Sequence, residues 1–224
     1  MSEFAKRLLG FLRPLRTFPV MPWTAKSRWE INFPRFFILL SGLTIFGFGD
    51  AIIVNSNIGN APWTVLAQGV NLRTNISLGF ATFVISSLVL IAWVPLREKP
   101  GFGTIANIVV IAVAIGFGVD HFPEANTFAT GIIFAFLGVA LVGIGSAFYI
   151  TCGLGPGPRD GLMTALHNRT GIRVSRIRLT IEITVLTLGF FLGGHVGLGT
   201  LIFALFIGQS IAVSIGVVAR LTSQ

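Results

Sequence analysis

Six apolar blocks of roughly membrane-spanning length limit the possible folds of this chain more than any other sequence feature. An α-helix needs about 20 mostly apolar residues to cross the hydrocarbon core of a bilayer. Transmembrane β-strands alternate polar and apolar positions, and these blocks do not. The pattern therefore predicts an all-α membrane protein with six transmembrane helices, at Phe36–Val54, Ser77–Pro95, Thr104–Val119, Phe128–Ile150, Ile177–Leu192 and Thr200–Ala219.

The basic residues between the blocks predict the orientation of the chain. Cytoplasmic loops of membrane proteins are enriched in Lys and Arg. With six spans and a cytoplasmic N-terminus, 15 of the 16 Lys and Arg residues lie inside, and Arg73 is the exception. This topology accounts for the net charge of +8 without a nucleic-acid partner, for which no recognisable module is present. We expect a multi-pass plasma-membrane protein with both termini in the cytoplasm.

The first 35 residues are basic and contain interspersed apolar side chains: Phe4, Leu8, Phe11, Leu12 and Leu15. Two interpretations are open. The segment forms a helix that lies on anionic lipid at the cytoplasmic face of the bilayer, or it only sets the topology through its charge. In both cases the lipid bilayer is the expected partner.

An internal repeat divides the rest of the chain. Residues 36–120 match residues 132–216 without gaps, with 19 identities in 85 positions, where the composition alone would give roughly 7. The predicted division is an N-terminal segment at 1–35, a first repeat at 36–127 and a second at 128–224. Each repeat holds three predicted spans, so the second is expected to be inverted relative to the first, an arrangement found in many secondary transporters.

Each repeat has a Gly/Pro break after its first span, with Gly59 and Pro62 matching Gly155 and Pro158. A short helical stretch follows each break, Trp63–Asn71 and Asp160–Asn168, and both are too short to span a bilayer. A helix N-terminus suits an anionic group, which favours a binding role, whereas a carboxylate in the first turn would cap the helix itself. A simple interfacial connector is the alternative.

Three motifs carry a resemblance to a known family: Gly155-Pro156-Gly157-Pro158-Arg159-Asp160-Gly161-Leu162-Met163, Arg169-Thr170-Gly171 and Gly197-Leu198-Gly199-Thr200. Over about residues 36–219 the chain resembles the YczE/YyaS/YitT group of bacterial integral membrane proteins. Members have an acid after a Pro-Trp pair in the first break, where this chain has Thr64. The resemblance implies a multispan plasma-membrane protein and no particular biochemical activity.

Polar residues inside apolar spans are costly, so they are the candidate ligand-binding residues. We expect two groups, Asp50, Asn55, Asn57 and Trp63 at the outer break and Arg159, Asp160, Arg178 and Glu182 at the inner break. Asp50 and Glu182 are candidates for a coupling proton. The four-residue spacing of Arg178 and Glu182 predicts an ion pair on one helix face, which would also serve simply to neutralise a buried acid. Tyr149 is expected to be an interface anchor.

These features favour transport of a small molecule or lipid-related compound through a site between the repeats. The alternative is a non-transporting scaffold or regulatory partner of another membrane complex, or a homo-oligomer, with Gly189-Phe190-Phe191-Leu192-Gly193 as a candidate contact face. No enzyme motif occurs, and the three histidines fall in separate loops, so neither catalysis, a metal nor a cofactor is expected.

Overall fold

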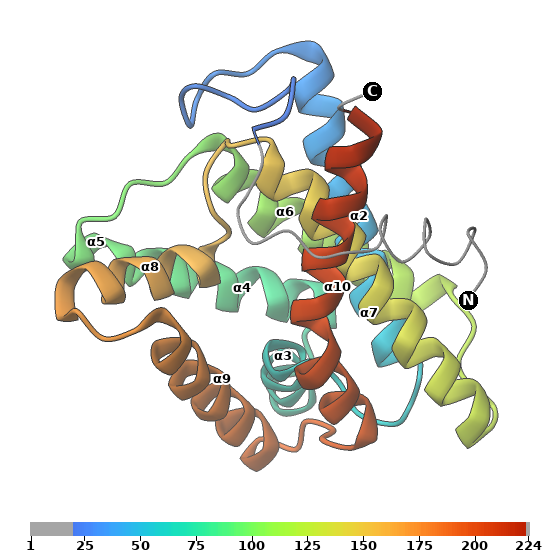
Figure 1. Ribbon diagram of the computed structural model, residues 1–224. Helices are drawn as coiled ribbons and strands as arrows, with labels where there is room; N and C mark the ends of the chain where they lie inside the picture. Colours follow the sequence, from blue (N-terminus) through green and yellow to red (C-terminus); the bar gives the residue numbers. More distant parts are fainter. Residues whose placement is uncertain (1–19, 223–224) are drawn as a thin grey trace.

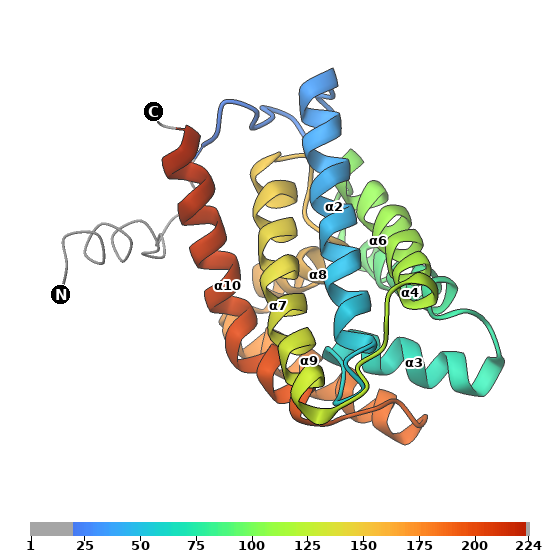
Figure 2. The ribbon, with the colours of Figure 1, turned by 90° about the vertical axis from the view of Figure 1, so that its right-hand side faces the viewer.

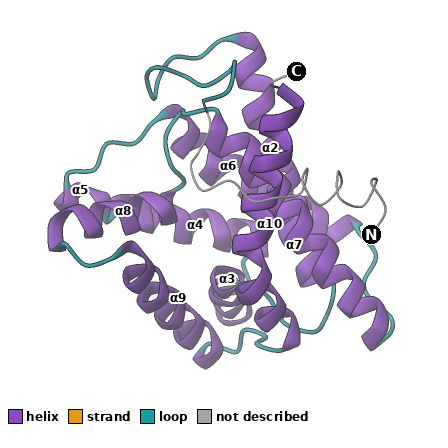
Figure 3. Ribbon diagram, viewed as in Figure 1, coloured by secondary structure: helices purple, strands orange, loops and turns teal. Residues whose placement is uncertain are grey.

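The computed structural model describes residues 20–222, and this range contains helices and no strand (Figures 1 and 3). The helices are α2 (Phe33–Val54), α3 (Pro62–Thr74), α4 (Leu78–Ile91), α5 (Trp93–Leu96), α6 (Phe102–His121), α7 (Phe128–Thr151), α8 (Pro158–Thr170), α9 (Val174–Phe191) and α10 (Leu198–Thr222). The predicted all-α class is confirmed. The predicted lipid-surface helix around Phe4 to Leu15 lies outside the described residues.

Five stretches of the described chain are long and apolar enough to cross a membrane: Phe33–Val54, Leu78–Leu96, Phe102–His121, Phe128–Thr151 and Leu198–Thr222. The second of them comprises α4 and α5. Helix α9, the fifth predicted span, is not among the five. It has 18 residues and carries Arg176, Arg178 and Glu182, which make it the most charged of the expected spans.

Helices α2 and α7 cross at the centre of the molecule through glycine contacts. A Cβ atom added at Gly145 would lie 2.5 Å from the carbonyl oxygen of Gly42, and one added at Gly49 would lie 2.8 Å from that of Gly138. Small residues let two helix backbones approach closely, which replaces the hydrophobic driving force that is missing between helices in lipid. This crossing therefore holds the two halves of the chain together.

The other helices are arranged around this crossing. Helix α6 packs on α2, and α10 packs on α7, which gives four long helices side by side (Figure 2). The remaining helices are α3, α4, α5, α8 and α9, of which α5, α8 and α9 lie to the left of α10 and α7 in Figure 1. Within this second group α3 packs against α9, and α8 packs against α4, α5 and α9.

The two Gly/Pro breaks are held by matching contacts. The Gly199 N–H donates to Ile58 O at 2.8 Å, and the Gly103 N–H donates to Leu154 O at 2.8 Å. The next residue in each break is a glycine with positive φ, 114° at Gly59 and 111° at Gly155. Residues with a side chain rarely adopt this backbone conformation, so both positions require glycine. Each break is thus fastened by the Gly-x-Gly-Thr turn of the other repeat.

Segments that the charge pattern predicts on one side of the membrane meet at one end of the molecule. The Trp23 indole N–H donates to Thr151 Oγ1 at 3.1 Å, and the Phe102 N–H donates to Arg28 O at 3.0 Å. These contacts tie the residues before α2 to the end of α7 and the start of α6. At the opposite end the Ala125 N–H donates to Asn55 O at 2.8 Å.

The glycine motif in α9 contacts the chain itself. A Cβ atom added at Gly189 would lie 2.5 Å from the Leu66 backbone nitrogen, and one added at Gly69 would lie 2.8 Å from Gly189 O. Gly189 therefore packs α9 against α3, and its face is not available to a partner helix. The expectation that Gly189–Gly193 forms an external contact face is wrong, because the spacing of small residues does not say which helix they meet.

The turn contacts predict different effects for the same substitution at two sites of α10. A Cβ atom at Gly199 would collide with the Gly59 carbonyl oxygen, whereas nothing lies within 4 Å of one at Gly208. We expect Gly199→Ala to lower the free energy of unfolding by about 1–3 kcal/mol, as forced overpacking does. Gly208→Ala is the matched control. The stability of each variant is measured as its midpoint of thermal unfolding in detergent. If Gly199→Ala and Gly208→Ala had the same midpoint, the turn contact at Gly199 would be contradicted.

Candidate functional site

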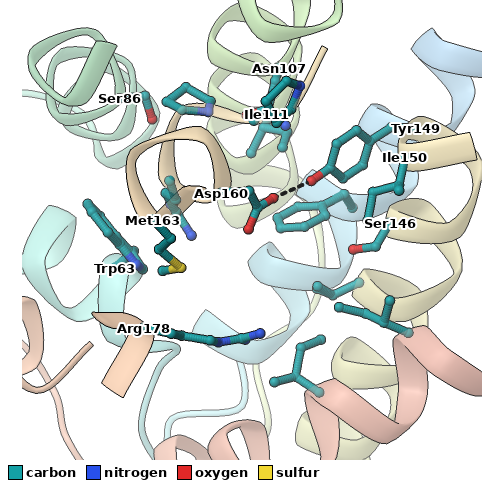
Figure 4. A pocket seen from close by; sticks show the side chains of 18 of the residues that line it. Trp63, Ser86, Asn107, Ile111, Ser146, Tyr149, Ile150, Asp160, Met163 and Arg178 are labelled. Atoms are coloured by element: carbon teal, nitrogen blue, oxygen red, sulfur yellow. Dashed lines mark hydrogen bonds between the residues drawn. The ribbon is translucent and has the colours of Figure 1, made fainter. Parts of the chain in front are cut away.

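A cavity of about 580 Å³ lies where the two Gly/Pro breaks come together. The first break contributes Ala61, Pro62 and Trp63, and the second contributes Gly153 and the residues from Gly155 to Asp160. Helices α2, α6, α7, α9 and α10 complete the wall (Figure 4). Two segments about 96 positions apart in the sequence therefore line one space.

The half-helices α3 and α8 both begin at this cavity. Each has proline at its first position, Pro62 and Pro158, and neither N-cap residue, Ala61 or Gly157, makes a side-chain capping hydrogen bond. Proline suits the first turn, where the missing N–H would have no helical partner. The N–H groups that follow, and the positive ends of both helix dipoles, make this end of the cavity favourable for negative charge.

Arg159 and Trp63 occupy matching positions in the two repeats and contact each other. The guanidinium carbon of Arg159 lies 4.9 Å from the centroid of the Trp63 ring, which is a cation–π contact. Within residues 20–222 this guanidinium donates no hydrogen bond to another side chain or carbonyl, although Asp50, Asp160 and Glu182 lie within electrostatic range. Its N–H groups are thus free to meet a ligand.

Asp160 and Tyr149 form a second contact in the cavity. The Tyr149 hydroxyl donates to Asp160 Oδ2 at 2.7 Å (Figure 4). This bond ties the carboxylate to α7, and within residues 20–222 the first-turn N–H groups of α8 donate no hydrogen bond to it. The side chain of Asp160 therefore does not cap α8. Tyr149 is buried and lines the cavity, so its expected role as an interface anchor is wrong.

Asp50 lies directly behind the first half-helix. It is 1% exposed, and its Oδ2 accepts a hydrogen bond from Thr64 Oγ1 at 3.0 Å. Its other oxygen, Oδ1, has no hydrogen-bond partner in the described chain. A buried carboxylate with one unpaired oxygen is costly, and the nearby charge of Arg159 offsets part of that cost.

The predicted pair of Arg178 and Glu182 is present on α9. Arg178 Nε lies 2.9 Å from Glu182 Oε1, and the two side chains are 44% and 26% exposed. Both line the cavity, and the arginine points into it from the side opposite Tyr149 (Figure 4). The pair therefore adds one cation and one anion to the cavity wall.

Two of the candidate residues lie elsewhere. The Asn55 side-chain amide donates to Phe122 O at 2.9 Å, and that of Asn57 donates to Glu124 Oε2 at 3.2 Å. Both connect the end of α2 to the loop before α7. The structure thus brings Trp63, Arg159, Asp160, Arg178 and Glu182 to one cavity with Asp50 beside it, and leaves the two asparagines outside.

Residues that were not singled out from the sequence hold the second half-helix. The Trp93 indole N–H donates to Pro158 O at 3.0 Å, and Thr104 Oγ1 donates to Pro156 O at 2.8 Å. The only sequence signal for Thr104 is its place in the repeated Gly-x-Gly-Thr turn. The sequence signal for Thr64 is its alignment with Asp160 of the second repeat. Nothing in the sequence pattern indicates Trp93.

One wall of the cavity is apolar. An apolar stripe on α10 consists of Phe203, Ile207 and Ile211, which are spaced four residues apart and lie on one helix face. Val142 continues this stripe on α7. The described residues contain no group of three or more His, Cys, Asp or Glu side chains arranged to hold a metal ion. The cavity therefore combines a charged end at the two breaks with an apolar side.

The contact between Thr64 and Asp50 predicts a stability difference between two variants of similar shape. Thr64→Val removes the hydroxyl and leaves the buried carboxylate without its hydrogen-bond donor, which costs about 1–3 kcal/mol. Thr64→Ser keeps the donor and is the control. We expect a lower midpoint of thermal unfolding in nanodiscs for the valine variant, and identical midpoints would show that the bond does not stabilise the fold.

The chain matches the model of a family described as of unknown function, DUF6198, over residues 33–215. No solved structure matches it. The chain is 41% identical over 209 residues to an uncharacterized protein of Haemophilus influenzae. The matched region covers 93% of this chain and 96% of that protein.

Two Bacillus subtilis proteins extend the comparison. The uncharacterized membrane protein YczE is 32% identical over 177 residues, 78% of this chain and 82% of YczE. The uncharacterized protein YyaS is 24% identical over 183 residues, 80% of this chain and 91% of YyaS. The resemblance expected from the Gly-Pro-Arg-Asp-Gly stretch is confirmed. The chain is a membrane protein that belongs to the DUF6198 family, together with YczE-like and YyaS-like relatives.

Proposed function

We propose that this protein transports a small molecule or lipid-related compound across the plasma membrane through the cavity between its two repeats. The observation that carries the proposal is the meeting of two uncapped half-helix N-termini at one charged cavity. Interrupted helices whose ends point at a central site are typical of secondary transporters. A scaffold would need neither the cavity nor the buried charges, which cost stability.

The proposed topology has six spans, with both termini in the cytoplasm and the second repeat inverted. Two observations support it. The contacts between Gly199 and Ile58 and between Gly103 and Leu154 are equivalent under the repeat, as are the two glycine contacts of α2 with α7. Segments that the charge pattern assigns to one side also meet at one end of the molecule. Helix α9 is the sixth span, and two of its charged residues, Arg178 and Glu182, line the cavity.

In this mechanism Asp50 carries a coupling proton. An anionic ligand that binds Arg159 competes for the charge that now offsets the buried Asp50 carboxylate. A buried carboxylate without a counter-charge is strongly unfavourable, so proton uptake at Asp50 would accompany ligand binding. Glu182 is the second candidate, since it lines the cavity and is paired with Arg178.

The transport proposal predicts that the cavity is reached from both faces of the membrane. We would place a single cysteine at Asn107, which lines the cavity on α6, in a Cys152→Ala background. A membrane-impermeant maleimide should label it in intact cells and also in inside-out vesicles. Ile105→Cys is the control, because Ile105 lies on the same helix, is 43% exposed and does not line the cavity. A thiol in lipid reacts poorly.

Labelling of Asn107→Cys from one face only, or from neither face, would contradict the transport proposal and favour the scaffold alternative. Labelling of Ile105→Cys to the same extent would show that the reagent does not report on the cavity.

The proton proposal predicts a pH dependence of the same labelling. The ratio of labelling from the two faces should change with pH in the Asn107→Cys chain that keeps Asp50, because gain or loss of a proton changes the charge of a buried carboxylate. Asp50→Asn should remove the change, because the amide cannot gain or lose a proton. Glu124→Gln is the control, since Glu124 contacts Asn57 in a loop outside the cavity. A pH response that survives in Asp50→Asn would rule out this residue.

A further inference from the structure

The two repeats differ in how their last two helices pack. In the first repeat α4 packs against α6, and a Cβ atom at Gly79 would lie 3.0 Å from the Cα of Gly116. The matching positions in the second repeat are Ser175 and Ala212. Among the helices of residues 20–222, α9 packs on α3 and α8 while α10 packs on α7, and α9 and α10 do not form a packed pair.

The cavity is lined from both of these helices, which do not pack against each other. Arg178 and Glu182 line it from α9, and Phe203, Ile207 and Ile211 line it from α10. Side chains on the outer surfaces of both helices are exposed, with Leu179 at 60% and Leu205 at 63%. In a bilayer these outer surfaces face lipid, and the cavity is lined from both of the helices that separate it from acyl chains on this side.

The charged end of the cavity favours an anion. Arg159 has free guanidinium N–H groups, and only the Nε of Arg178 is engaged with Glu182. The N–H groups at the starts of α3 and α8 add donors without side-chain caps. The acids are partly occupied, since Tyr149 holds one oxygen of Asp160. Unengaged guanidinium N–H groups of two arginines and the starts of two uncapped helices therefore meet at this end of the cavity, which suits a phosphate, sulfate or carboxylate group.

We propose that the ligand of this cavity is an anionic amphiphile, with its charged head between Arg159 and Arg178 and its alkyl chain along Phe203, Ile207 and Ile211, leaving between α9 and α10 toward the bilayer. This inference rests on the proposed function of the cavity and names its substrate class. We infer the alkyl chain from the apolar stripe. A small polar anion would leave the stripe in contact with water, whereas an alkyl chain would cover it.

The test uses the full chain in phosphatidylcholine nanodiscs, with dodecyl phosphate as the probe. Binding to the folded state raises the midpoint of thermal unfolding in a concentration-dependent way. Dodecyl phosphate should raise the midpoint, whereas inorganic phosphate, which has the head alone, and dodecyltrimethylammonium, which has the opposite charge, should not. Arg159→Gln should weaken dodecyl phosphate binding by roughly tenfold or more, the usual effect of losing a charge-assisted hydrogen bond.

A matched pair of variants tests the path of the alkyl chain. Ile207→Trp fills the apolar stripe and should weaken dodecyl phosphate binding, while Leu205→Trp places the same residue on the outer surface of α10 and should not. If Ile207→Trp lowers the midpoint without ligand, Ile211→Phe, at a half-buried position on the same stripe, replaces it.

The outcomes separate this inference from the transport proposal. Inorganic phosphate binding as well as dodecyl phosphate would overturn the amphiphile and leave transport of a small anion in place. Equal effects of Ile207→Trp and Leu205→Trp would overturn the proposed chain path. No binding of any probe, together with labelling of Asn107→Cys from both faces, would refute the ligand class and leave transport standing.

Discussion

The close crossing of α2 and α7 is the interaction on which the rest of the structure depends. Their backbones approach at Gly42 with Gly145 and at Gly49 with Gly138, where a side chain on any of the four glycines would collide with the other helix. In lipid, where burial of apolar side chains gives no advantage over contact with acyl chains, such packing is what holds helices together. Because the crossing joins the first helix of each repeat, it also brings the breaks that follow those helices into one place.

The cost of charge in a membrane explains the arrangement around the cavity. Arg159, Asp160 and Glu182 would be unfavourable toward lipid, and each lies where another charge or a polar group offsets that cost. Asp50 is only partly compensated: Thr64 and the charge of Arg159 act on it, but one of its oxygens is unpaired. An imperfectly compensated acid next to an arginine with free donors is typical of a site that gains its remaining partners from a ligand and a proton.

The fold could be predicted further than the site. The apolar blocks locate all the long helices, because each must satisfy its backbone hydrogen bonds within itself. The repeated Gly59 and Gly155 mark the breaks, since positive φ leaves few other choices. The roles of Tyr149 and Gly189 could not be predicted, because a tyrosine near a helix end or a glycine on a helix face does not say which element it meets. The sequence did not separate Asn55 and Asn57 from Asp50 as candidate ligand-binding residues, because a polar residue near the end of a span does not show which element it meets.

The sequence by itself determined the all-helical class, the helix positions, the two breaks and the ion pair of Arg178 with Glu182. These features follow from short-range rules, namely hydrophobic length, glycine and proline geometry, and four-residue spacing. Only the tertiary structure decided that the two breaks share one cavity, that Arg159 stacks on Trp63, and that α9 and α10 do not pack against each other. These features depend on contacts between residues far apart in the chain, which no local sequence pattern records.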